Sequence, residues 1–397
     1  MLSRALGRQL DLADVGMAAS MPVPTDLGLD YLSSPDEAID AVARLWRADL
    51  DEATVLLKST PSTAAWNNAP LGWLVAADTA RASADLAEPR VGSSDVERIR
   101  TTTNLFAQLD NRFGGGHARH ALIQFLAGDV EPLLRGRYRD KAGADLFSAA
   151  AEATLLAAWM SYDSGLHSPA QRYFIQALGL AQAGSDPLLP ATILDAMSHQ
   201  ATFLGRFREA ANLARAARTG TRALATPTLT AHFYAMEARA LARVGDAPGC
   251  ELALSQAVTG FERRHPDNDP EWIRYFDDAE LAAEFGHCLR DLGRPAAAAR
   301  YAAQSLHSAC GPRSDFFATL VLADAHLRAG DADQACHIAL DALQLGQQIK
   351  SARCISYLQE FRADLQPAAG TSAFRDFEEQ AAASVLWRQA TACEVLS

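Results

Sequence analysis

The chain has 397 residues, of which 49% are hydrophobic and 21% are charged, and its formal net charge at pH 7 is −12. This composition is typical of a folded protein, and the acidic excess disfavours a broad nucleic-acid-binding face. No apolar run reaches the roughly 18 residues of a transmembrane helix, and the N-terminus lacks the apolar core of a secretory signal. Six scattered cysteines without a CxxC pair favour reduced core thiols. We therefore expect a cytoplasmic protein without a metal or cofactor.

The N-terminal third of the chain is irregular. Pro22, Pro24 and Gly28 predict that residues 21–35 form a linker. Helical spacing of apolar residues begins after Pro35, which fits the first turn of a helix. Residues 36–145 are expected to form an irregular helical region.

A glycine run interrupts this region at Gly114, Gly115 and Gly116, shortly before Arg119. Backbone amides ahead of a helix attract anions, so the run could form an anion-binding turn. However, the chain has neither the Lys-Ser/Thr of a phosphate-binding loop nor a preceding strand. A tight turn between two helices is the favoured alternative, because glycine permits strained backbone.

Residues 146–350 contain one pattern five times. A helical stretch ends at a glycine, and a small residue follows five positions later, and usually again after seven more. The glycines are Gly165, Gly205, Gly245, Gly293 and Gly330; the first small residues are Ala170, Ala210, Cys250, Ala298 and Ala335. Such a period predicts stacked helical hairpins, since one hairpin cannot bury its apolar face alone. Residues 351–397 lose the pattern and are expected to cap the stack.

Polar and aromatic side chains on the first helix of each hairpin are the candidates for a concave binding groove. They could clamp a peptide or small ligand, with arginine as the bidentate partner of a carboxylate. The alternative is that they are hydrogen-bonded spacers between stacked helices. The candidates, including a tyrosine near this face, are Trp159, Tyr162, Asp195, His199, Arg239, Tyr275, Glu280, His287 and Arg290.

Other constellations favour ordinary structural roles. Neighbouring His and Cys residues at 287–288 and 336–337 point about 100° apart on a helix, which disfavours a zinc site. No GxSxG, HExxH, SxxK or kinase motif occurs, so we expect no enzyme activity. The basic run RGRYRDK at 135–141 is better explained as a solvated loop than as a nucleic-acid surface.

The turns resemble those of the tetratricopeptide repeat. Gly286, Leu289, Gly293 and Ala298 fit that motif, while Tyr301 is one position away from the usual aromatic residue. The repeats here are longer than the usual period of about 34 residues. The resemblance implies an all-α, right-handed solenoid of about five hairpins.

A resemblance that covers almost the whole chain is to actinobacterial helix-turn-helix/tetratricopeptide-repeat transcriptional regulators, the NsdA-like group. The segments that carry it include LGRQLDLADVGM, LDNRFGGGHARHAL, MSHQATFLGRFREA and SARCISYLQEFRADL. In that family residues like 1–20 form the exit of the DNA-binding domain. The recognition helix has no counterpart after Met1, so DNA binding is not assigned to any residue of this chain.

The resemblance implies the sensory or protein-interaction region of a regulator of differentiation or secondary metabolism. It would bind a peptide, a small ligand or a partner protein in its groove and would act on DNA only through an absent reader domain. The sequence does not distinguish a monomer from a homodimer. The alternative is an adaptor that assembles other proteins and never contacts DNA.

Overall fold

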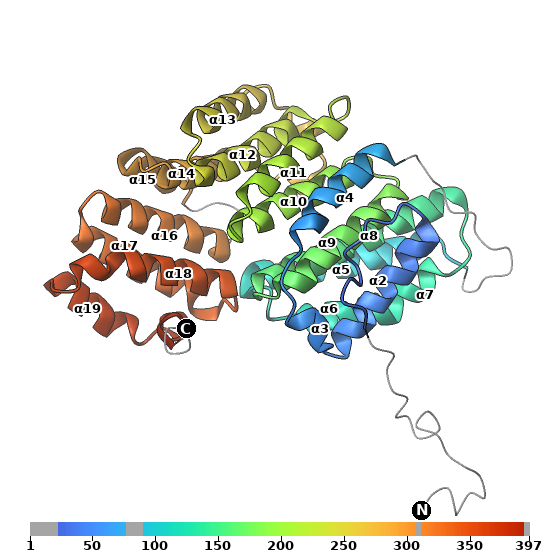
Figure 1. The fold of residues 1–397 in the computed structure, drawn as a ribbon, viewed down its shortest axis with the longest axis horizontal. Coiled ribbons are helices and arrows are strands. Elements are labelled where there is room, and N and C mark those ends of the chain that lie inside the picture. The colour runs from blue at the N-terminus through green and yellow to red at the C-terminus, as the bar shows by residue number, and fades with distance from the viewer. Residues whose placement is uncertain (1–22, 77–89, 307–310, 393–397) are drawn as a thin grey trace, which may run out of the picture.

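A computed structural model describes residues 23–76, 90–306 and 311–392, and these form helices joined by turns, with no strand in the described ranges (Figure 1). The prediction of an all-α solenoid of helical hairpins is confirmed. Residues 1–20, expected to be the exit of a DNA-binding domain, lie outside the described residues.

The irregular N-terminal region consists of short and long helices that pack onto the first hairpins. Their bounds are α2 Pro35–Leu50, α3 Thr54–Leu57, α4 Thr63–Val75, α5 Ser93–Phe113, α6 Arg119–Phe125 and α7 Glu131–Leu134, with a π-helical turn at Leu126–Val130. Helices α2, α3 and α4 contact α9, α4 also contacts α11, and α5 and α6 contact α8. This region therefore covers two sides of the first two hairpins.

The five predicted hairpins are present, each as a pair of contacting helices. They are α8 Asp140–Asp163 with α9 His167–Gln182, α10 Leu189–Phe203 with α11 Phe207–Gly220, α12 Pro227–Val244 with α13 Ala247–Phe261, α14 Asp278–Asp291 with α15 Pro295–Gln304, and α16 Pro312–Arg328 with α17 Ala332–Leu345. The first hairpin thus begins six residues earlier than predicted.

One backbone conformation, common to all five turns, explains why each turn has a glycine. All five predicted glycines have φ between 70° and 88°, a conformation in which a Cβ atom is strained. The amide after each glycine donates to the carbonyl five residues back, for example Asp246 to Leu241 at 3.0 Å. This is the Schellman motif, which ends one helix and leads directly into the next.

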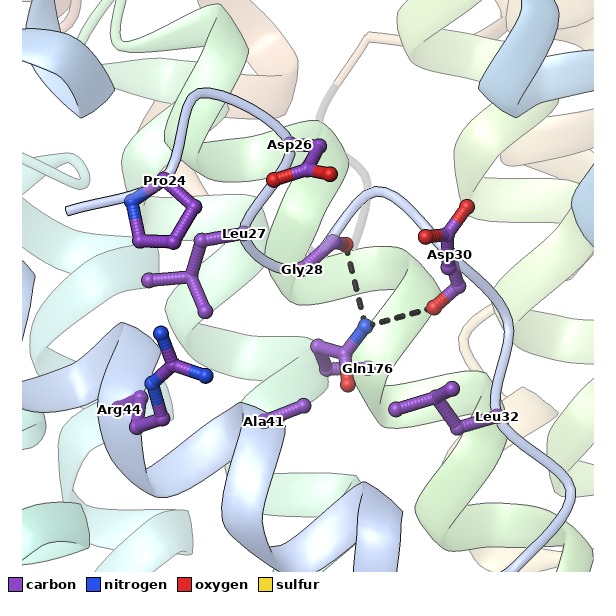
Figure 2. Close-up of a pocket in the computed structure, with 9 residues that line it drawn as sticks. All are labelled: Pro24, Asp26, Leu27, Gly28, Asp30, Leu32, Ala41, Arg44 and Gln176. Atoms are coloured by element: carbon purple, nitrogen blue, oxygen red, sulfur yellow. Dashed lines mark hydrogen bonds between the residues drawn. The ribbon is translucent and has the colours of Figure 1, made fainter.

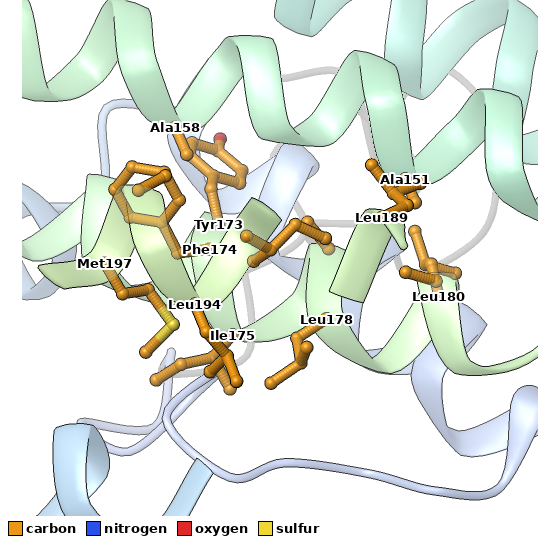
Figure 3. Packing of buried hydrophobic residues seen from close by; sticks show 14 of the residues in the cluster. Ala151, Ala158, Tyr173, Phe174, Ile175, Leu178, Leu180, Leu189, Leu194 and Met197 are labelled. Carbon is orange, nitrogen blue, oxygen red and sulfur yellow. The ribbon is translucent and has the colours of Figure 1, made fainter. Parts of the chain in front are cut away.

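The small residues lie where the two helices of a hairpin approach most closely. The residue five positions after each turn glycine, Ala or Cys250, is fully buried in all five hairpins. Larger side chains fill the remaining space; between α8, α9 and α10 these include Phe174, Leu178 and Leu194 (Figure 3). Small residues set the close helix spacing, and large ones interdigitate around them.

The predicted linker is packed from residue 23 onward. The Arg172 side chain on α9 donates to the carbonyl oxygens of Leu27 and Thr25, the latter at 2.8 Å. Gln176 donates to the carbonyls of Gly28 and Asp30 at 3.1 and 3.0 Å (Figure 2). Sequence composition indicated a turn-rich segment correctly but could not show that α9 would supply its hydrogen bonds.

Of the C-terminal helices, α18 Ala352–Leu365 packs on α16, α19 Ser372–Ala381 packs on α17, and α20 Val385–Ala392 packs on α18. They share a second apolar core with α16 and α17, built around Phe316, Phe361 and Trp387. Within the described residues, the main apolar core extends from Leu27, before α2, to Phe276, before α14, and two small clusters on α12 to α16 lie between the two cores. The solenoid therefore has two well-packed ends joined by a thin fourth hairpin.

We predict that Gly205→Ala lowers the free energy of unfolding by about 1 to 2 kcal/mol, because its φ is 73° and the strain of a left-handed L-residue is of this size. A Cβ atom at Gly205 would meet no heavy atom within 4 Å, so a steric clash does not contribute. Urea denaturation followed by circular dichroism measures the change.

The matched control is Gly128→Ala, which is in equally open space but within the π-helical turn. Alanine there should leave stability unchanged or raise it by up to about 1 kcal/mol. Equal destabilisation by both substitutions would contradict the backbone explanation.

Candidate functional site

The predicted groove residues lie on the first helices of the hairpins, except that Tyr275 precedes α14. The structure places Trp159 and Tyr162 on α8, Asp195 and His199 on α10, Arg239 on α12, and Glu280, His287 and Arg290 on α14. Most of them are buried: Tyr162 is fully enclosed, whereas Tyr275 is 47% exposed. The predicted residues thus lie mainly on the expected helices, and their side chains contact one another.

Side-chain contacts connect α8, α10, α12 and α14 in order. The Tyr162 hydroxyl lies 3.1 Å from Nδ1 of His199, which joins α8 to α10. Asp195 Oδ2 lies 3.1 Å from Nδ1 of His232, which joins α10 to α12. Nη1 of Arg239 donates to Oε2 of Glu284 at 2.8 Å, which joins α12 to α14.

Further contacts continue through α16 and α18 and return to α8. Nε of Arg290 lies 3.6 Å from Oδ2 of Asp324 on α16. The Arg353 guanidinium on α18 lies over the Phe317 ring of α16 at 4.7 Å and over the Tyr162 ring of α8 at 4.8 Å. The first helices of the five hairpins and α18 are thus connected by contacts that lead back to α8, and we call the side chains of these contacts the inner ring.

Further predicted residues join the ring from its edges. Trp159 packs edge-on against His199 with ring centroids 5.4 Å apart. The Tyr275 hydroxyl lies 3.2 Å from Nε2 of His232. Glu280 accepts a hydrogen bond from Ser314 at 2.8 Å. The His287 ring packs against Tyr357 of α18 at 6.0 Å.

Sequence reasoning missed His232, Glu284, Arg353 and Tyr357. Glu284 lies one turn from Glu280 and His287 on α14, and His232 lies two turns before Arg239 on α12, so helical spacing could have found both. Arg353 and Tyr357 lie in SARCISYLQEF, after the repeat pattern has ended. No local signal indicated that α18 would face the first hairpin.

The surroundings shift the pKa values of the ring histidines in opposite directions. Burial, together with the nearby Arg353 and Arg239, lowers the pKa of His199 well below its usual value. Burial, Arg239 and Arg290 do the same for His287. Burial alone would lower the pKa of His232, but the Asp195 carboxylate raises it above its usual value. The neutral rings lie where the arginines create a positive potential.

The glycine run forms a turn that is filled from within the chain. The Gly114 amide donates to the Asp110 carbonyl, the Gly115 amide to Oδ2 of Asp163 at 2.9 Å, and the Gly116 amide to the Lys350 carbonyl at 3.3 Å. Arg119 pairs with Asp49 and donates to Ser161. These donors already have partners, so the geometry supports the tight helix–helix turn and not a site for a free anion.

This turn is one side of a contact between the two ends of the solenoid, which we call the closing seam. The Lys350 amide, between α17 and α18, donates to the Phe113 carbonyl at 2.7 Å. A Cβ atom on Gly115 would come within 2.5 Å of the Met160 carbonyl oxygen, so only glycine allows this approach.

The Asp163 side chain contacts residues from both sides of the closing seam. Its carboxylate accepts hydrogen bonds from the Gly115 amide and, at 2.8 Å, from the Ser351 hydroxyl. It also lies 3.5 Å from Arg313 and 3.8 Å from Arg353, while its side chain is only 2% exposed. Arg313 in turn pairs with Asp110 at 2.9 Å. A buried carboxylate needs such partners, so these residues specify how the two ends meet.

Several polar atoms of the inner ring have no hydrogen-bond partner within the described residues. They are Nε of Arg239, Nε of Arg353, Nδ1 of His287 and Oδ1 of Asp195. Within the same ranges no three His, Cys, Asp or Glu side chains are grouped to hold a metal, and no helix is long and apolar enough to cross a membrane. The ring is suited to recognising polar groups of another molecule.

We predict that Asp163→Asn lowers the free energy of unfolding by about 3 to 5 kcal/mol, because removing one partner of a buried ion pair leaves the others uncompensated. Arg313 and Arg353 would lose their shared carboxylate. Urea denaturation at neutral pH measures the loss.

The matched control is Asp364→Asn, whose carboxylate lies 2.6 Å from Arg328 but is 42% exposed. A surface pair of this kind contributes up to about 1 kcal/mol. A seam variant no less stable than this control would contradict the role of Asp163.

We predict opposite pH effects for the ring histidines. The raised pKa of His232 gives stability that is complete below the unfolded value of about 6.5 and is lost as pH rises through the folded pKa. The lowered pKa of His287 instead removes stability as pH falls below about 6.5. Unfolding free energies measured from acid to alkaline pH test both signs.

In that series His232→Gln should cost most at acid pH, and His287→Gln should reduce the loss of stability on acidification. Identical pH profiles for the two variants and the unaltered chain would contradict the assignment.

Comparison with known proteins does not assign this chain to a family. No protein-family model matches the chain, and none of the curated proteins matches it.

Proposed function

We propose that the chain is the sensory or interaction region of a regulator and that it recognises a ligand or partner through the inner ring. The observation that carries the proposal is that polar and aromatic side chains from the five first helices and from α18 contact one another in one continuous series. Solenoids commonly use the surface along such helices for binding.

The polar atoms without partners support binding over a purely structural role. Buried polar groups in folded proteins are nearly always hydrogen-bonded, and an unmet one costs about 1 to 3 kcal/mol. Four such atoms lie on Arg239, Arg353, His287 and Asp195, within the part of the chain described. A bound molecule with matching groups would remove these costs.

The layout also supports a route for a signal. The two apolar cores at the ends of the solenoid are joined by the thin fourth hairpin and by the closing seam. A ligand that changes the inner ring would therefore change how the ends meet. In a regulator this movement would reach a DNA-binding part through the N-terminal region; that last step follows only from the resemblance to helix-turn-helix/tetratricopeptide-repeat regulators.

An adaptor that assembles proteins without contacting DNA is the second candidate. The observation in its favour is the end of α4, where Leu71 is 61% and Val75 is 82% exposed. No charged residue occurs between Lys58 and Asp78. An apolar, uncharged helix face in water is typical of a protein-contact surface.

We predict that the double substitution Arg239→Gln with Glu284→Gln changes the levels of the transcripts that the protein regulates. This pair of changes removes a buried ion pair without leaving a lone charge. Complementing a deletion strain with this variant, followed by transcript profiling, measures the effect at matched protein levels. Arg208→Ala, an exposed arginine on α11, is the control and should behave like the unaltered chain.

The adaptor predicts the reverse pattern. Val75→Asp would remove partner capture, while the inner-ring variant would leave both capture and transcription unchanged. Unchanged capture and unchanged transcription in the inner-ring variant would refute the sensory proposal.

A further inference from the structure

We propose that the inner ring binds a small organic anion, whose carboxylate or phosphate lies between Arg353 and Arg239. This inference rests on the proposed function and adds the chemical class of the ligand. Three observations carry it: the placement of Arg353, the placement of Arg239, and the excess of unused donors around them.

Arg353 is oriented but poorly paired. Its guanidinium lies between the faces of Tyr162 and Phe317, at 4.8 and 4.7 Å, which fixes the plane of the group. Its nearest carboxylate is Asp163 at 3.8 Å, beyond hydrogen-bond distance. Its Nε is buried without a partner among the described residues, and the side chain is 11% exposed. This is an arginine held ready for an acceptor.

Arg239 offers a second donor on the neighbouring side of the ring. One of its Nη groups donates to Glu284 at 2.8 Å, while its buried Nε has no partner in the described part of the chain. Both arginines act electrostatically on the same three groups, Tyr162, His199 and His287. Arg239 on α12 and Arg353 on α18 therefore both lie near these three side chains.

The balance of donors and acceptors selects an anion over a cation. The carboxylates next to the two arginines already have partners, since Glu284 accepts from Arg239 and Asp163 accepts from Gly115 and Ser351. Among the described residues, Oδ1 of Asp195 is an unpaired acceptor of the ring, whereas both arginines have an unpaired Nε donor. Burial and the arginines keep His199 and His287 neutral, so the potential around them is positive. Charge-assisted bonds from a guanidinium are the strongest that such a region can offer.

The walls of the region define the remainder of the ligand. The rings of Tyr162 and Phe317 lie against Arg353, and Trp159 and Tyr357 pack against these two rings. The side chains of Arg239, Glu284 and Arg353 remain 10 to 12% exposed, so solvent reaches this face. These features fit a compact anion with an aromatic or aliphatic body.

Arg353 also connects this site to the closing seam. An anion that bonds the Arg353 guanidinium competes with Asp163, which lies 3.8 Å away. Asp163 would then hold the seam with one cationic partner fewer. The hydrogen-bonded amides of Gly116 and Lys350, which join Lys350 to the glycine turn, report this loosening.

The experiment compares the N-acetylphenylalanine anion with its uncharged amide on the full chain, by calorimetry and thermal denaturation. The acid should bind and shift the melting temperature, and the amide should do neither. Benzoate and phenyl phosphate distinguish a free small acid from a peptide end and a carboxylate from a phosphate. Hydrogen exchange at Gly116 and Lys350 should become faster when the acid binds.

Arg353→Gln and Arg239→Gln should each weaken binding of the acid by about tenfold or more, because each removes a charge-assisted donor. Arg353→Lys keeps the charge but not the planar stacking group, so it should bind with intermediate affinity. The matched control is Arg264→Gln, which removes an arginine that stacks on Phe261 at 3.8 Å and pairs with Asp278 away from the ring.

Equal binding of acid and amide by the unaltered chain, or binding of neither, would overturn the proposal without any variant. Unchanged affinity in both glutamine variants would overturn it equally. Unchanged hydrogen exchange would remove the link to the seam. The sensory function itself fails only if inner-ring variants leave transcription and partner capture unaltered, which these binding measurements do not address.

Discussion

The arrangement of the whole solenoid depends on one buried carboxylate. Asp163 ends α8, and its oxygens bind the Gly115 amide from the N-terminal region and the Ser351 hydroxyl from the start of α18. A stack of hairpins has no intrinsic reason to bring its ends together, because each hairpin packs only on its neighbours. A desolvated anion that lacks water must find protein donors, and here these donors come from both ends of the chain. The seam therefore turns an open stack into a closed one.

Closure explains why the inner ring differs from an open groove. Because α18 lies against α8, Arg353 stacks on Tyr162 and the ring side chains of six helices are connected by contacts. Burial, followed by the charges of nearby arginines, lowers the pKa values of His199 and His287. The same side chains on an exposed concave surface would be solvated and only weakly coupled. Their mutual contacts make the ring one unit.

Local features of the fold were predictable, and long-range ones were not. The turn glycines and the buried Ala170 or Cys250 follow from backbone strain and helix contact, which depend on a few neighbouring residues. Counting back from the turn glycines also placed Arg239 and His287 on the first helices of their hairpins. Their burial, the role of Arg353 and the packing of residues 23–35 on α9 depend on pairs that are distant in sequence: Arg239 and Glu284 are 45 residues apart, and Arg172 and Thr25 are 147 residues apart. No periodic pattern encodes such pairs.

The chemistry of the seam bears on whether closure is permanent. An apolar contact between the ends would be stabilised by about 25 cal/mol for each Å² of apolar surface buried. A charged ligand would not compete with such a contact. The seam is instead polar: the desolvation cost of Asp163 and Arg313 offsets much of their attraction, so the net free energy of closure is small compared with its parts. An element of this kind can be biased by a modest change in charge. Arg353 belongs both to the inner ring and to the surroundings of Asp163, so a charge that enters the ring acts directly on the balance that holds the solenoid closed.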